Sequence, residues 1–168
     1  MNTMSALPRA ATPGTPPRLP SAASPSEVAA PSVGQRLEDR QFALLQQACA
    51  PHGGLAGGDE VARRLRRHAA QPLSMLARWI VGREVISLVW RGQTWLPLFQ
   101  FDLATMTPHE PVRAALRELA DAFDDWDAAL WWATPNAWLH GDAPVDAITR
   151  DPQAVLQAAR ADRYVALG

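Results

Sequence analysis

The sequence predicts a mainly α fold, in which a helix-turn-helix with a small β-hairpin wing is followed by a C-terminal helical module. Apolar residues recur at helical spacing along most of residues 35–163, and only residues 85–98 change to strand-like alternation. Proline and glycine divide these segments. Of the 168 residues, 48% are hydrophobic and 20% charged, which is enough apolar material for a globular core.

The N-terminal segment 1–34 contains seven prolines and no aromatic residue. It cannot bury enough apolar surface to offset the entropy of ordering, so we expect it to be disordered. Residues 35–54 should form a short amphipathic helix over 35–49 and then a linker, since Pro51 and the following glycines stop a helix.

Residues 55–103 are predicted to form the helix-turn-helix part. Asp59 is the expected N-cap of a helix over 60–68, and Pro72 suits the first turn of a helix over 72–82. The second helix should bury Leu73, Leu76 and Ile80. Two strands, 85–90 and 94–98, should form the hairpin, with Pro97 making the second strand an edge or ending it early.

Residues 104–168 are predicted to be helical. Helices are expected over 110–123, over 125–133 with Asp124 or Asp125 as its cap, and over 152–163. Pro135 should end the middle helix because its ring cannot continue the hydrogen-bond ladder.

Charge separates these two parts. Residues 55–91 carry seven arginines and three acids, about +4, whereas residues 110–151 carry three arginines and nine acids, about −6. A basic helix-turn-helix with a wing can place its second helix in the major groove of DNA. The alternative is a protein-binding face or a scaffold that no longer binds DNA. The candidate DNA contacts are Arg63, Arg64, Arg67, Gln71, Ser74, Arg78, Arg83 and Arg91.

No catalytic set, metal site or cofactor motif is found, so we do not expect an enzyme. The four histidines are scattered, and the acids near Asp124 lack a calcium-loop pattern. The single cysteine, Cys49, is expected to be a structural or incidental thiol in a reducing compartment. Without a membrane span or a signal peptide, the protein is expected in the cytoplasm and away from membranes.

Four of the seven tryptophans lie between residues 126 and 138. Some must be core, but four indoles exceed what so small a helical part can bury. One or two should therefore lie at a surface, where tryptophan is a favoured anchor for a protein partner. Trp131, Trp138 and His140 are the first candidates for such contacts.

The segment WATPNAWLHGDAPVDAITRDPQAVLQAA, which begins at Trp132, resembles the toxin-binding domain of the Xre/MbcA/ParS antitoxin family. Phe99–Asp102 also looks like the segment that joins the two parts in that family, and the resemblance covers about residues 58–162. The matching motif positions are Trp132, Pro135, Asn136, Leu139, Gly141, Pro144 and Asp146.

The resemblance implies an antitoxin whose C-terminal domain binds and blocks a RES-domain toxin, an enzyme that destroys NAD. It also implies a helix-turn-helix that can bind the promoter of its own operon, and a homodimer. A stand-alone transcriptional regulator of the same fold, without a toxin, is the alternative. The expected toxin-binding residues are Trp131, Trp132, Pro135, Asn136, Trp138, Leu139, His140, Gly141, Pro144 and Asp146.

Overall fold

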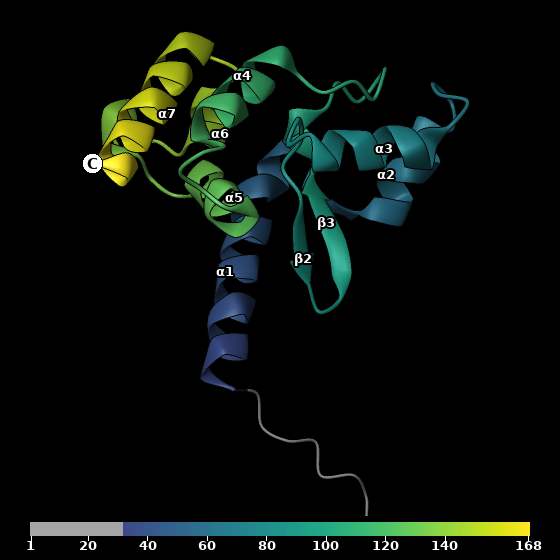
Figure 1. Ribbon diagram of the computed structural model, residues 1–168, viewed down its shortest axis with the longest axis horizontal. Coiled ribbons are helices and arrows are strands. Elements are labelled where there is room, and N and C mark those ends of the chain that lie inside the picture. The colour runs from purple at the N-terminus through teal and green to yellow at the C-terminus, as the bar shows by residue number, and fades with distance from the viewer. Residues whose placement is uncertain (1–31) are drawn as a thin grey trace, which may run out of the picture. The chain divides into compact units, whose positions relative to one another are not determined.

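The computed structural model describes residues 32–168, so residues 1–31 of the segment 1–34 that was expected to be disordered lie outside them. The expectation is wrong for Val33 and Gly34, which belong to a helix. The described part is mainly helical with one small antiparallel sheet (Figure 1). Its α-helices are α1 (Val33–Cys49), α2 (Gly58–Leu65), α3 (Pro72–Val81), α4 (Glu110–Leu119), α5 (Asp125–Ala133), α6 (Pro144–Ala147) and α7 (Pro152–Leu167). The strands are β1 (Leu55–Gly57), β2 (Leu88–Trp90) and β3 (Gln93–Pro97), and three short 3-10 helices are η1 (Ala50–His52), η2 (Leu98–Gln100) and η3 (Ala137–Leu139).

Several helix ends follow from local capping chemistry. Ser32 and Gln35 form a capping box that starts α1 two residues before the expected position. The Asp124 side chain accepts a hydrogen bond from the Asp127 N–H at 2.8 Å, which confirms the predicted cap of α5. The expected cap at Asp59 is wrong, because α2 begins at Gly58 and Asp59 lies within its first turn. Helix α4 ends at Leu119, earlier than expected, and α7 continues to Leu167.

The predicted hairpin is present as β2 and β3, which pair in antiparallel fashion from Leu88–Trp95 to Trp90–Gln93. Arg91 and Gly92 form its turn with φ angles of 49° and 73°, as a two-residue hairpin loop requires. The expectation that Pro97 marks an edge strand is wrong, because β3 lies between β1 and β2. Pro97 is nevertheless the last residue of β3, so the expected early end is confirmed.

Two clusters of buried apolar residues support these elements. One is formed by β1, α2, α3, β3 and the residues after β3, and it includes Val61, Leu76 and Leu96. The expected burial of Leu73 is wrong: its side chain is 64% exposed, because α3 faces the core through Leu76 with Met75, Trp79 and Ile80 beside it. Leu73 instead lines an open groove of about 370 Å³ between α3, the start of α2 and the hairpin.

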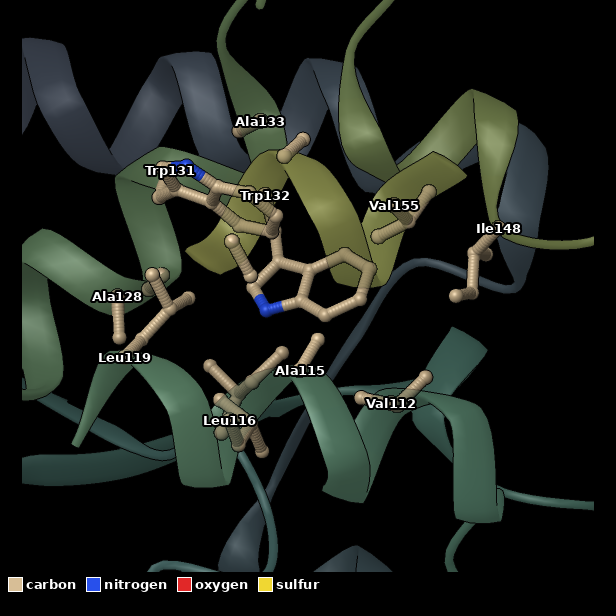
Figure 2. Packing of buried hydrophobic residues seen from close by; sticks show 14 of the residues in the cluster. Val112, Ala115, Leu116, Leu119, Ala128, Trp131, Trp132, Ala133, Ile148 and Val155 are labelled. Atoms are coloured by element: carbon tan, nitrogen blue, oxygen red, sulfur yellow. The ribbon is translucent and has the colours of Figure 1, made fainter. Parts of the chain in front are cut away.

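The larger cluster joins α1, β2, α4, α5 and α7. Figure 2 shows the Trp132 indole in its centre, with Ala115 and Leu116 of α4 on one side and Val155 of α7 on another. In Figure 1, α1 runs between α5 and the hairpin. On the hairpin side Phe42 stacks on Trp90 with ring centroids 4.0 Å apart, so α1 is packed into the fold by aromatic contact.

Candidate partner-binding surface and basic face

The loop that follows α5 is fixed by hydrogen bonds of Asn136. Its side chain accepts from the Trp138 N–H at 2.8 Å, and its main-chain N–H donates to the Asp142 carbonyl at 3.0 Å. His140 and Gly141 then reverse the chain with φ angles of 59° and 91°. The left-handed geometry explains the glycine, and the loop is closed on itself before α6 begins.

The Asp162 carboxylate, on α7, receives three side-chain hydrogen bonds from this region. Its Oδ2 accepts from Trp131 Nε1 at 2.7 Å and from Asn136 Nδ2 at 2.6 Å. Its Oδ1 accepts from Trp138 Nε1 at 3.0 Å. Sequence reasoning missed Asp162. The only available signal was that buried indole and amide N–H groups need acceptors, and this signal does not identify the acceptor.

The expected toxin-binding residues fall into two groups. The residues of the first group are buried and support the loop from inside the protein: Trp131, Trp132, Asn136, Leu139 and Pro144. The second group is exposed: Pro135, Trp138, His140, Gly141 and Asp146. Trp138 is the large apolar member of the exposed group, with 58% of its surface accessible.

Asp146 is held by a residue distant in the sequence. Its Oδ1 lies 2.8 Å from Nε2 of His52, in the short helix after α1. Asp146 also lines a groove of about 310 Å³ between the end of α1 and the end of α5, together with Leu44, Gln47, Ala48, Pro51 and Ala133. The contact between His52 and Asp146 ties α6 to η1, the short helix that follows α1.

The end of α7 adds apolar surface beside the loop. Tyr164, Val165 and Leu167 are all more than half exposed. Val165 lies three residues after Asp162, so it shares the helix face that holds the Trp138 indole. Trp138 and Val165 therefore contribute to one exposed apolar surface, here called the Trp138 surface and defined by these two residues. Tyr164 and Leu167 lie on another side of α7, where they line a groove with Arg160 and Arg163.

The predicted DNA-binding arginines also fall into two groups. Arg63 and Arg64 pair with Glu60 one turn earlier on α2, and the bond from Arg64 is the main reason why the pKa of Glu60 is lowered. Arg91 lies 4.5 Å over the Trp90 ring and donates to Asp39, which lowers the pKa of that carboxyl.

Arg83 has a structural role. Its guanidinium donates to the main-chain carbonyls of Ala120 and Phe123, each at 2.6 Å, just after the end of α4. It also lies 3.4 Å from an oxygen of Asp125 at the start of α5. Arg83 therefore joins α4 to α5, and its nitrogens are engaged within the protein.

The other predicted DNA contacts are exposed around the turn between α2 and α3. Arg67 and Arg78, together with neighbouring Arg66, make no side-chain bond to any residue in the described part of the chain. Gln71 and Ser74 are exposed beside them. A shallow groove of about 310 Å³ is lined by Ala70, Gln71, Ser74, Met75 and Arg78. We call Arg66, Arg67, Gln71, Ser74 and Arg78 the basic face.

Within residues 32–168, no group of three His, Cys, Asp or Glu side chains is placed to hold a metal ion. None of the helices in this range has the length and apolarity needed to cross a membrane. Cys49 is buried, and its burial raises the pKa of the thiol to about 11, so it is a weak nucleophile at neutral pH. Comparison with protein families, with curated proteins and with solved structures gives no match to this chain.

Proposed function

We propose that this protein is an antitoxin-like inhibitor that binds and neutralises a cytoplasmic RES-type, NAD-degrading toxin. The observation that carries the proposal is the exposed Trp138 on a loop fixed by Asn136 and Asp162. Large aromatic side chains held in one place are favoured anchors of protein interfaces, because little conformational entropy is lost on binding. The type of partner follows from the resemblance of the segment around Trp132 to toxin-binding domains.

The shape of the site favours binding over chemistry. The exposed residues of the loop include no nucleophile paired with a base, and the acid beside Trp138 is occupied by three donors. Exposed Val165, on the face of α7 that holds Trp138, enlarges the area that a partner could cover.

Co-expression with the product of the adjacent gene tests the proposal. That product alone should stop growth and lower cellular NAD, and this chain should restore both and co-purify with it. Trp138→Ala should abolish rescue, whereas Val81→Ala, at an exposed apolar position on α3, should not. An adjacent product that is harmless alone, or rescue that survives Trp138→Ala, would contradict the proposal.

A second candidate function is binding to the operon's own promoter DNA, either with the toxin or as a stand-alone regulator. The observation in its favour is the basic face, whose arginines are exposed and unpaired within the described residues. Arginine and glutamine are side chains that contact phosphates and base edges. Binding should weaken steeply as salt rises.

A mobility-shift titration with upstream DNA tests this second function. Changing Arg67 and Arg78 together to Ala should remove the shift and reduce its salt dependence. The matched change Arg117→Ala, an arginine on α4 that pairs with Glu110, should leave the shift intact. An unchanged shift after the double substitution would argue against the basic face.

Homodimer formation is part of the proposal, again from the resemblance. Helix α1 offers exposed apolar side chains at Val33, Leu37 and Leu44, spaced by four and seven residues along one side. Light scattering should give twice the chain mass, and Leu37→Asp should shift it toward the monomer.

A further inference from the structure

Trp138 combines an exposed ring with an indole N–H that is hydrogen-bonded within the protein. It is 58% exposed, yet its indole N–H is bonded to Asp162 at 3.0 Å. We propose that Asp162 is a positioning residue, which holds the Trp138 indole ready for a partner and leaves it with only apolar surface to offer. The identity of the partner rests on the proposed function, whereas the positioning of the indole by Asp162 does not depend on it.

The two oxygens of the Asp162 carboxylate accept hydrogen bonds from different sides of the site, which supports this role. Oδ2 accepts from the buried side of the site, from Trp131 and Asn136, at 2.7 and 2.6 Å. Among residues 32–168, Oδ1 accepts only from the exposed Trp138 indole. Both oxygens must be acceptors, since all three neighbours are N–H donors. An ionised carboxylate meets this requirement, because it accepts at both oxygens and donates at neither.

The arrangement also indicates the chemistry of the partner's site. The indole N–H is the single polar group of a tryptophan side chain, and here it is satisfied within the protein. A pocket that receives Trp138 therefore needs no hydrogen-bond acceptor. Val165 lies on the same helix face as Asp162 and is exposed. The expected partner surface is thus an apolar pocket for the indole with an apolar rim that reaches Val165.

The substitution Asp162→Asn distinguishes a role of Asp162 in positioning the Trp138 indole from a role in folding. An amide has one acceptor oxygen and one donor group. Its oxygen should remain with Trp131 and Asn136, where two bonds are formed, so that its NH₂ group faces the Trp138 N–H. Two donors then oppose each other, and the Trp138 indole is released while the buried bonds remain.

The first measurement needs no partner. Indole N–H signals of the ¹⁵N-labelled full chain are assigned with Trp131→Phe and Trp138→Phe. In Asp162→Asn, the Trp138 signal should exchange with water at least about tenfold faster, as for a broken hydrogen bond, while the Trp131 signal keeps its protection. The matched control is Asp151→Asn, which retains a capping residue at the start of α7 and should change neither signal. Unchanged Trp138 exchange, or equal loss at both indoles, would overturn the positioning role.

The second measurement uses an inactive form of the adjacent gene's toxin in a calorimetric titration. Asp162→Asn should weaken affinity about fivefold to tenfold, and it should add nothing once Trp138 is already Phe. Equal weakening in both backgrounds would overturn the inference, because Asp162 would then act without Trp138. If the unaltered chain binds no toxin, the proposed function fails, while the exchange measurement still decides whether Asp162 positions the indole.

Discussion

The side-chain amide of Gln100 forms a reciprocal pair of hydrogen bonds with the main chain of Ile86. Its Oε1 accepts from the Ile86 N–H at 2.5 Å, and its Nε2 donates to the Ile86 carbonyl at 2.9 Å. Nε2 also donates to the Pro97 carbonyl at 2.9 Å. Gln100 is buried, so this one side chain satisfies main-chain groups that water cannot reach.

Gln100→Leu should therefore lower the free energy of unfolding by about 2–4 kcal/mol, because it leaves buried Ile86 groups without partners. Urea denaturation checks this value. The control is Gln153→Leu at an exposed position of α7, which should change stability by less than about 0.5 kcal/mol. Equal effects of the two substitutions would show that the amide bonds contribute little.

Arg83 and Arg78 should differ in their effects on stability, although both were candidate DNA contacts. Arg83→Ala removes two bonds to main-chain carbonyls after α4, and we expect a loss of about 1–2 kcal/mol given its partial exposure. Arg78→Ala removes no such bond and should stay within about 0.5 kcal/mol. Denaturant titration of both variants provides the comparison, and a larger loss for Arg78→Ala would contradict the assigned roles.

Local chemistry explains which elements could be predicted. Pro72 begins α3, Asp124 caps α5, and a turn follows Trp90 as expected, although it has two residues where three, Arg91 to Gln93, were expected. Each signal lies within a few residues of the element it specifies. Strand β1 was not predicted, because three residues carry no periodicity and their pairing with β3 depends on the tertiary fold. For the same reason β3 was not recognised as the central strand.

The candidate site was predictable only in its outline. The tryptophan excess indicated that at least one indole would be exposed, and Trp138 is exposed. Whether an arginine is hydrogen-bonded within the protein depends on tertiary contacts. One example is the bond from Arg83 to the Ala120 carbonyl, 37 positions away in the sequence. The role of Asp162 could not be predicted because this residue lies on α7, which begins after the loop that Asp162 holds. Spacing along the chain specifies neither contact.

The Cys49 thiol should resist modification until the protein opens. Burial raises its pKa to about 11 from an ordinary value of 9.0, so little thiolate exists at pH 8. Iodoacetamide labelling in native buffer should be at least about tenfold slower than in denaturant.

The raised pKa of Cys49 also makes the free energy of unfolding depend on pH in the alkaline range. Because the folded-state pKa lies above the unfolded one, the unfolded chain loses its proton first, between about pH 9 and 11. The contribution of Cys49 to stability is thus complete below pH 9 and falls as the pH rises through 11. Cys49→Ala should remove this component from the pH dependence of urea unfolding, and an identical pH dependence in the variant would refute the assignment.

Trp132 and Trp138 lie six residues apart, but their replacement should have opposite consequences. Trp132 is 1% exposed in the middle of the larger cluster, so Trp132→Ala should cost about 3–5 kcal/mol through the cavity it leaves. Its Nε1 has no hydrogen-bond partner among the described residues, so Trp132→Phe should be tolerated far better. Trp138→Ala removes one hydrogen bond and mainly exposed surface, and should cost about 1 kcal/mol or less.

Thermal and urea unfolding of these three variants, paired with the growth-rescue assay, separates support of the fold from contact with a partner. Trp132→Phe should keep both stability and rescue, whereas Trp138→Ala should keep stability and lose rescue. If Trp138→Ala instead unfolds the chain as readily as Trp132→Ala does, its loss of rescue reports folding. The Trp138 surface would then have no independent support as the place where a partner binds.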